Sequence, residues 1–466
     1  MIRSANIGLL AGLAGGILLS GCAVGPHYQP PVDAAVAVRN TDPALESDTS
    51  PEPTWWRSFG DPVLDSLIER ALGSNLDVRQ AVARVDQARA LFSSSKFELL
   101  PHITSNAGYT RSDEQIPGLT PGRVNIESAD IGLDAAWEVD LFGRVRHGVD
   151  AAAREAGAAQ ADLDGAKVSV AAEVAMNYLQ LRGAQARRNV VEQNAQSERE
   201  TLKLTSLRVK EGYAEPADRE SSKAQLGAVE ALIPALDAQI AQAAQRLAVL
   251  TGERPGALDV ELAAPVTIAP RVTPLPIGDA STFLRRRPDV RAAERRLAAE
   301  TARTGVATAD LFPRVTVTGF VGLLTGDVSN LFAKNSQAWT VSPAVTWPAL
   351  DIGSQLAQLR AQKAKGHESQ LAYEKTVLGA IEDLQDALTN YKLRQTELSK
   401  LVEEVDGARK AADLARMRYQ AGGSDYLRVL DAERVQLQGE DALTQAQTAS
   451  NTDIVAIYKA LGGGWS

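Results

Sequence analysis

An internal duplication is the feature that most constrains the fold of this 466-residue chain. Asp77-Val78-Arg79 recurs 212 positions later as Asp289-Val290-Arg291, and Leu100-Pro101 recurs at the same spacing as Phe312-Pro313. Four further pairs are separated by 210 positions: Trp137 and Trp347, Gly143 and Gly353, Arg208 and Arg418, and Gly212 and Gly422. Because these residues keep their order at nearly one spacing, we interpret the chain as two copies of a unit of about 210 residues.

Each copy contains two segments in which apolar and polar residues alternate, which predicts strands with one apolar face. The predicted strands cover about 101–112 and 125–137 in the first copy and about 313–325 and 337–347 in the second. Roughly ten residues is the length that a tilted transmembrane strand needs. Four strands cannot close a barrel, and an open edge in lipid leaves backbone groups unpaired, so several chains would have to share one barrel. The alternative is an ordinary soluble hairpin in each copy.

Two long proline-free segments, about 144–211 and 354–421, follow the strand pairs. Apolar residues recur there at spacings of three and four, as in Leu378, Ile381 and Leu384, which predicts helices. At 1.5 Å per residue, each helix would be about 100 Å long. Such helices need a continuous apolar contact with neighbouring helices, as in coiled coils.

The other segments set the domain boundaries. Proline-rich, weakly periodic sequence predicts an extended tether at the N-terminus and a linker between the two copies. Shorter helices, about 62–97, 218–250, 281–311 and 426–461, complete the two copies. The predicted organisation is a signal peptide at 1–21, a tether at 22–60, a first repeat at 61–252, a linker at 253–279 and a second repeat at 280–466.

The N-terminus is typical of an exported protein. Arg3 precedes a short apolar run that ends at Leu19, which predicts a secretion signal. Leu19-Ser-Gly-Cys22 resembles the lipobox of bacterial lipoproteins, and this resemblance implies S-diacylglycerol and N-palmitoyl groups on Cys22. Ala23 stands where an Asp usually retains lipoproteins at the inner membrane, which implies the outer membrane. Cys22 is the only cysteine, so internal disulfides are excluded; the alternative role is an inert small core residue.

Composition and spacing argue against several other classes. A formal net charge of -9 is unlike that of a nucleic-acid-binding protein. No apolar stretch is long enough to span a bilayer as a helix, so a membrane crossing would use strands. His27, His102, His147 and His367 have neither zinc-ligand spacing nor a neighbouring nucleophile motif, and we expect isolated surface histidines. There is no glycine-rich phosphate loop before a helix. We therefore expect no enzyme, no metal and no cofactor besides the lipid.

Several motifs then point to one family. The strongest runs from Leu284 to Arg296 and is followed by Gly305-Val-Ala and Leu311-Phe-Pro313. It is supported by Trp55-Trp56 with Asp61-Pro62, by Trp137-Glu-Val-Asp-Leu-Phe-Gly143, and by Tyr419 with Gly422 and Leu430-Asp431-Ala432. On these residues the chain resembles the outer-membrane factor family, TolC- or OprM-like, in its NodT-type lipoprotein branch that serves RND-type tripartite efflux. The resemblance covers essentially the whole chain.

The resemblance implies a mainly α fold with a membrane β-barrel. Three chains would each give four strands to one twelve-stranded barrel, which a long α-helical periplasmic tunnel continues. The implied partners are two further copies, a periplasmic adaptor protein, an inner-membrane RND pump and outer-membrane lipid, with no nucleic acid. The implied function is a passive, gated export duct for drugs and small toxic compounds, as in multidrug resistance. The alternatives are an exit duct for type I protein secretion and a non-conducting coiled-coil scaffold lipoprotein.

The resemblance also implies a periplasmic gate near the turns that end the long helices. Leu427 would form an apolar constriction, and Asp431 with Arg434 would form a polar lock. Three copies of Asp431 around a threefold axis repel one another unless a cation or an arginine lies between them. Tyr419 belongs to the same stretch, and Asp218 stands where the family often has a lock carboxylate. The alternative for Asp431 and Arg434 is a solvated helical pair.

Two departures from the family pattern fall at the gate. Arg428 stands where relatives can have another acidic residue, and Glu215-Pro216 makes the first-copy turn unlike the usual apolar one. Arg285-Arg286-Arg287 could suit an anionic partner, but we expect this cluster to meet carboxylates or carbonyl groups of its own trimer. We expect Trp55 and Trp56 to be packing anchors.

Overall fold

The structure is a computed structural model that describes residues 23–30, 45–47, 49, 52–115, 117–118, 121–266, 274–277 and 283–463. It divides into two compact units, each assembled from segments far apart in the sequence. The first comprises the described residues within 1–32, 84–160 and 292–375, and the second comprises those within 33–83, 161–291 and 376–466. Both units therefore take corresponding segments from the two sequence copies.

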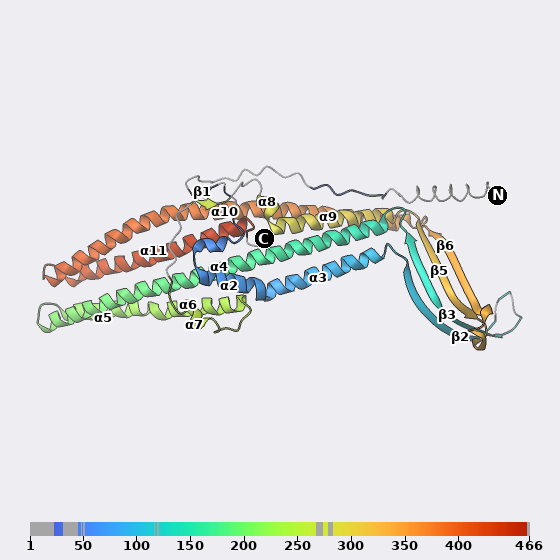
Figure 1. Cartoon of the computed structure of the whole chain (residues 1–466). Helices are drawn as coiled ribbons and strands as arrows, with labels where there is room; N and C mark the ends of the chain where they lie inside the picture. Colours follow the sequence, from blue (N-terminus) through green and yellow to red (C-terminus); the bar gives the residue numbers. More distant parts are fainter. Residues whose placement is uncertain are drawn as a thin grey trace. The chain divides into compact units, whose positions relative to one another are not determined.

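The first unit contains a four-stranded antiparallel sheet. Figure 1 shows its strands side by side in the order β2, β3, β5 and β6. Their bounds are His102–Glu114, Val124–Val139, Arg314–Thr325 and Gln337–Thr346. Each copy supplies one hairpin, and pairing of β3 with β5 joins the two copies in one sheet.

The register gives the sheet an apolar and a polar face. Leu133 lies opposite Ser105 on one side and Val321 on the other, and Val321 lies opposite Trp339. Because side chains alternate along a strand, this register gathers most of the large apolar residues on one face, while Phe320 and Leu324 of β5 lie on the other. That face includes Ile103, Ile131, Leu133, Val321, Trp339, Val341 and Val345, all of them exposed in the single chain.

The polar face carries Thr104, Asp134, Thr318 and Thr340, among others. Asn106 donates a hydrogen bond from Nδ2 to Oδ2 of Asp130 over 2.6 Å between β2 and β3 on this face. A sheet with one apolar and one polar face suits a boundary between an apolar and an aqueous medium.

The duplication extends to single hydrogen bonds at the base of the sheet. The indole nitrogen of Trp137 donates to the carbonyl oxygen of Leu99, and that of Trp347 donates to the carbonyl oxygen of Leu311, each over 3.1 Å. The two acceptors are separated by 212 positions, like the first sequence pairs. Each indole thus fixes the end of its strand to the turn before the hairpin.

Two very long helices contain 136 of the 466 residues. Helix α4 spans Arg144–Lys210 and α10 spans Ile352–Gln420, 67 and 69 residues without proline. Two shorter helices precede the hairpins, α3 (Leu76–Phe97) and α9 (Pro288–Ala309). No helix within the described ranges is both long and apolar enough to cross a membrane.

The second unit adds shorter helices. They are α2 (Pro62–Ser74), α5 (Pro216–Glu230), α6 (Leu232–Leu250), α7 (Asp259–Leu262), α8 (Phe283–Arg286) and α11 (Tyr426–Ala460). Trp55, in the short 3-10 helix η1 (Trp55–Phe59), stacks on Tyr458 with ring centroids 5.2 Å apart. Trp55 and Trp56 are 2% and 3% exposed, so their expected role as packing anchors is confirmed.

Three of the shorter helices are broken where the sequence predicted continuous ones. Between α2 and α3, the side-chain oxygen of Asn75 accepts hydrogen bonds from the backbone nitrogens of Asp77 and Val78 and begins a new helix. The α5–α6 and α8–α9 breaks precede Pro234 and Pro288. Proline lacks the backbone N–H and clashes with the carbonyl four residues earlier. Helical periodicity alone does not reveal these interruptions.

The tether and the linker, both predicted to be irregular, contain a short parallel ladder. Strand β1 (Glu46–Ser47) pairs with β4 (Leu275–Pro276). The backbone nitrogen of Leu275 donates to the carbonyl oxygen of Leu45 over 2.7 Å, and that of Ile277 donates to Ser47 over 3.1 Å. Two residues per strand are too few to produce a recognisable alternation.

Candidate functional site

The turns that end the two long helices share one geometry. Gly212 and Gly422 both lie in the left-handed region, with φ of 77° and 78°. The backbone nitrogen of Tyr213 donates to the carbonyl of Arg208, and that of Gly423 donates to the carbonyl of Arg418, each over 2.8 Å. This is a glycine-terminated helix end, which satisfies carbonyls at the last turn. The glycine that recurs in the two sequence copies therefore marks the end of each long helix.

An aromatic cluster fills the second-copy turn. Tyr419 and Tyr426 are 3% and 1% exposed, with ring centroids 5.8 Å apart, and they pack with Val429 and Leu430. Arg208 lies over the Tyr419 ring, with its guanidinium carbon 4.5 Å from the ring centroid. Arg208 also donates from Nη1 to the Tyr419 carbonyl oxygen. The first-copy long helix therefore holds the second-copy turn, a role that sequence reasoning missed for Arg208.

The predicted gate residues Leu427, Asp431 and Arg434 are all exposed on α11. Leu427 is 61% exposed, which suits an apolar contact beyond its own chain. Arg434 donates from Nε to Oε1 of Gln225 over 3.0 Å. Within the described part of the chain, no hydrogen bond or ion pair joins Asp431 to Arg434, so the polar lock and the solvated helical pair both stay predictions. Asp431 is therefore exposed to solvent in the single chain.

Asp218 has a local role at the first-copy turn. It is the third residue of α5 and forms a capping box with Glu215, whose backbone nitrogen donates to Oδ2 of Asp218 over 3.4 Å. Pro216 occupies the first helical position, where a missing N–H costs nothing. The unusual Glu215-Pro216 pair therefore starts a helix, and Asp218 stabilises that start.

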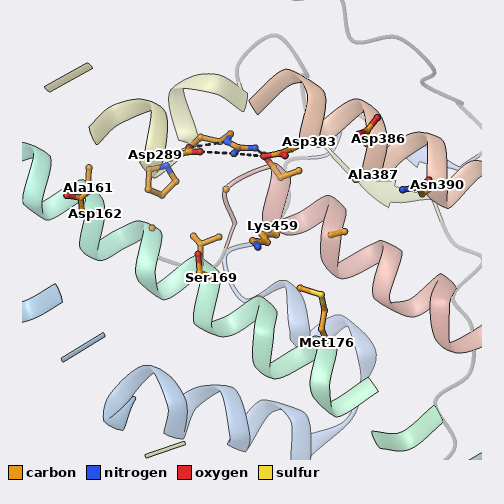
Figure 2. A pocket seen from close by; sticks show the side chains of 17 residues that line it. Ala161, Asp162, Ser169, Met176, Asp289, Asp383, Asp386, Ala387, Asn390 and Lys459 are labelled. Atoms are coloured by element: carbon orange, nitrogen blue, oxygen red, sulfur yellow. Dashed lines mark hydrogen bonds and ion pairs between the residues drawn. The ribbon is translucent and has the colours of Figure 1, made fainter. Parts of the chain in front are cut away.

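The family motif in the second unit borders a cavity of about 530 Å³ (Figure 2). Arg287 donates from Nη2 to Asp289 over 2.7 Å and to Asp383 over 2.9 Å, and from Nη1 to the Ala460 carbonyl over 3.1 Å. Burial favours the neutral forms, but the Arg287 guanidinium holds the pKa of Asp289 below its usual range. Arg287 thus meets carboxylates and a carbonyl of its own chain, which favours a structural role over an anionic partner.

The lipid-attachment residue Cys22 lies outside the described residues. The segment that follows it is packed within the first unit. The backbone nitrogen of Val24 donates to the Phe142 carbonyl oxygen over 3.0 Å, and Nε2 of His147 lies 3.0 Å from the Val24 carbonyl oxygen. His147 is 9% exposed, so the expectation of a surface histidine was wrong here. His147 is buried by an N-terminal segment that is far away in the sequence, so the residues next to His147 do not predict its burial.

Gly305 of the family motif makes this packing possible. A Cβ added there would lie 2.7 Å from the His147 ring, and one added at Gly25 would lie 2.9 Å from the Gly305 Cα. The N-terminal segment therefore approaches helix α9 at a distance that only glycine allows. Tyr28 then donates from its hydroxyl to Oε1 of Glu294 over 2.6 Å.

No group of three or more His, Cys, Asp or Glu side chains suited to a metal ion occurs among the residues that the structure describes. The prominent features are instead a two-faced sheet, two proline-free long helices and two equivalent glycine turns. Together they define the TolC-like class of outer-membrane channels, in which a sheet is joined to long periplasmic helices.

The chain belongs to the outer membrane efflux protein family, whose model matches residues 67–253 and 280–463. Each match falls on one of the two sequence copies. The chain is 30% identical over 451 residues to nodulation protein T of Rhizobium leguminosarum bv. trifolii, covering 97% of this chain and 96% of that protein. It is 29% identical over 458 residues to the toluene efflux pump outer membrane protein TtgC of Pseudomonas putida, covering 96% and 94%.

Solved structures agree with this assignment. The outer-membrane channel OprN is similar with a TM-score of 0.93 and 43% identity, over 95% of this chain and all of that chain. The open-state MtrE outer membrane channel of Neisseria gonorrhoeae has a TM-score of 0.82 and 29% identity, over 96% and 99%. The chain is therefore an outer-membrane channel component of tripartite efflux systems that extends into the periplasm. Its family is one of channels, and homotrimers are typical of it.

Proposed function

We propose that three copies of this chain form one gated duct that exports drugs and small toxic compounds, supplied by a periplasmic adaptor and an inner-membrane RND pump. The observation that carries the proposal is the unfinished sheet. Among the described strands, β2 pairs only with β3 and β6 pairs only with β5. One edge of each outer strand therefore lacks a partner in the single chain.

An unpaired strand edge in a bilayer is costly, because lipid cannot replace the missing hydrogen bonds. Pairing β6 of one copy with β2 of the next removes every edge, and three copies give twelve strands. The apolar face, with Trp339 76% exposed and Val341 63% exposed, then contacts lipid. The polar face, with Asp130 and Asp134, lines an aqueous passage.

The duct performs no reaction of its own under this proposal, and the pump supplies the energy. Cys22 carries the S-diacylglycerol and N-palmitoyl groups that anchor the chain to outer-membrane lipid. Docking of Val24 against Phe142 and His147 supports an anchor near the sheet, since Val24 is only two residues from the lipid. Leu427 and Asp431, three copies of each, close the periplasmic end.

The two alternatives predict different things. A scaffold lipoprotein needs no two-faced sheet, so the register of β2 to β6 disfavours it. Secretion of a polypeptide would use the same fold. The toluene efflux pump protein TtgC and the antibiotic efflux pump protein ArpC, both relatives, favour small compounds.

The shared barrel is tested by cysteine cross-linking between neighbouring chains. Cysteines replace Thr104 or Asn106 in β2 and Thr340 or Ser342 in β6, all on the polar face. We expect at least one pair to give covalent trimers after oxidation. A control pair, Ser105→Cys with Ser342→Cys, places the thiols on opposite faces and gives no product. Absence of covalent trimers from every same-face pair would contradict the shared barrel.

The cargo is tested in the host. Deleting the gene should raise cellular accumulation of a lipophilic dye several-fold, and the wild-type gene should restore export. Unchanged dye accumulation together with loss of a secreted protein would support the type I secretion alternative instead.

A further inference from the structure

Two acidic side chains are buried against each other in the second unit. Glu198 of α4 and Glu433 of α11 are each 3% exposed. Thr201, three residues after Glu198 on α4, donates its hydroxyl to Oε1 of Glu433 over 3.3 Å, so Glu198 lies on the face of α4 that meets Glu433. A hydrogen bond between two carboxyl groups requires one of them to carry a proton, because two carboxylates offer only acceptors. One oxygen of each, Oε2, has no hydrogen-bond partner among the described residues.

Among the described residues, Arg416 is the cation that bonds to this acidic pair, and its Nη1 also donates to Asp413 over 3.2 Å. Arg416 of α10 donates from Nε to Oε1 of Glu433 over 2.7 Å, and the Thr201 hydroxyl donates to the same oxygen over 3.3 Å. Gln225 of α5 and Tyr426 of α11 also lie near Glu198, and neither supplies a positive charge. A single guanidinium cannot compensate two buried carboxylates. Burial, and next the charge of Glu433, accordingly raise the pKa of Glu198 to about 8.

The same chain contains a matched junction with an amide in place of the acid. One helical turn before Glu198, Asn194 donates from Nδ2 to Oε2 of Glu440 over 3.0 Å. Arg409 donates from Nε to Oε1 of Glu440 over 2.6 Å, as Arg416 does to Glu433. Burial opposes ionisation of Glu440, yet hydrogen bonds from Arg409 and Asn194 lower its pKa below the usual range. At this junction the Asn194 amide donates the hydrogen bond. At Glu198, a carboxyl group can donate one only when it is protonated.

We propose that Glu198 and Glu433 form a one-proton site that locks α4 against α11, so that the two helices separate locally when the proton leaves for solvent. The site concerns packing within one chain, and it goes beyond the proposed export function, which does not require it. Because Glu433 lies two residues after Asp431, the site is a regulatory device next to the candidate gate. Protonated, the pair makes one carboxyl hydrogen bond and one Arg416 ion pair. Deprotonated, it leaves two buried negative charges beside one guanidinium.

The sign of the pH dependence follows from linkage. The pKa of Glu198 in the packed state, about 8, lies above its ordinary value of 4.5. The packed state therefore binds more protons than the locally open state between these values. Its stabilisation is complete below the ordinary value and is lost as pH rises toward about 8. The local opening equilibrium should increase by up to about tenfold per pH unit within that window.

Hydrogen exchange on the purified full-length protein in detergent, from pH 6 to 9, tests the proposal. Protection factors, corrected for the intrinsic exchange rate, are compared for peptides covering 197–204 and 429–436. We expect them to fall by up to about tenfold per pH unit up to pH 8, and to stay constant in Glu198→Gln. Peptides around Asn194 and Glu440 serve as an internal control and should be constant in both proteins.

A second variant provides a test that does not depend on whether Glu198→Gln folds correctly. Asn194→Glu turns the control junction into a second acidic pair, so the peptides around Glu440 should become pH-dependent. A pH-independent wild type would overturn the proposal. So would equal pH dependence in wild type and Glu198→Gln. Neither result bears on whether the trimer conducts, so failure here is distinguishable from failure of the export function.

Discussion

The guanidinium of Arg208 covers the ring of Tyr419 at 4.5 Å and also hydrogen-bonds to the Tyr419 carbonyl oxygen. The two residues come from different sequence copies, so this contact joins the end of α4 to the end of α10. Tyr419 in turn packs on Tyr426, the first residue of α11 and the neighbour of Leu427. Arg208 therefore contacts the turn from which α11, the helix of the candidate gate, begins.

Replacing Arg208 with Ala should loosen the second-copy turn. The change removes a cation–π contact and a charged hydrogen bond, and we expect the free energy of unfolding of the helical part to fall by about 1–3 kcal/mol. Denaturant titration in detergent, followed by circular dichroism, measures the change. Arg199→Ala is the matched control, because Arg199 lies on α4 like Arg208 and forms an exposed ion pair with Glu230 of α5. Its effect should stay within about 0.5 kcal/mol, and equal losses in both variants would argue against a special role for Arg208.

Gly322→Ala should destabilise the sheet. Gly322 of β5 lies opposite Gly132 of β3, and an added Cβ would lie 2.6 Å from the Gly132 Cα and 2.9 Å from the Phe320 ring. Overpacking of this kind costs about 1–3 kcal/mol. Loss of the folded band at a lower temperature on a semi-native gel reports the change. Gly319→Ala is the control, since its nearest atom would be at 3.4 Å; a lower melting temperature for this control than for Gly322→Ala would contradict the packing argument.

Cys22→Ser should abolish lipidation, because serine lacks the thiol that forms the thioether. Cells labelled with radioactive palmitate report the modification, with wild type as the positive control. We expect no label on the variant. Labelling of the variant at the wild-type level would show that the lipid is attached to a residue other than Cys22.

Much of the fold could be predicted from the sequence, because strands and helices differ in the spacing at which apolar residues recur. Alternation predicted strands near 101–112 and 125–137, and the structure has them at His102–Glu114 and Val124–Val139. The absence of proline predicted the long helices, which end within two residues of the expected positions. Helix breaks at Asn75 and before Pro234 depend on single capping or steric contacts. The ladder between the tether and the linker depends on two residues per strand, so neither feature has a period to detect.

The candidate site was less predictable. Family resemblance selected Leu427, Asp431 and Asp218. The structure has Leu427 and Asp431 exposed on α11 and Asp218 in the capping box of α5, and their role in a gate stays a prediction. The contacts of Arg208, His147 and Glu198 join segments more than a hundred residues apart, and no local pattern marks them. In the sequence, Glu198 cannot be distinguished from a solvated glutamate on a long helix, because its burial depends on a neighbouring helix.

Conductance of the purified protein in a planar bilayer, with its mass in detergent measured on the same sample, tests the central claim of a gated trimeric duct most directly. We predict a trimer whose small conductance grows in Asp431→Ala, because removing three exposed carboxylates frees their partners at the closed end. Asp406→Ala is the control, since Asp406 forms an exposed pair with Lys410 and should leave conductance unchanged. A monomer, or a trimer that never conducts even with Leu427 and Asp431 both replaced by Ala, would contradict the account.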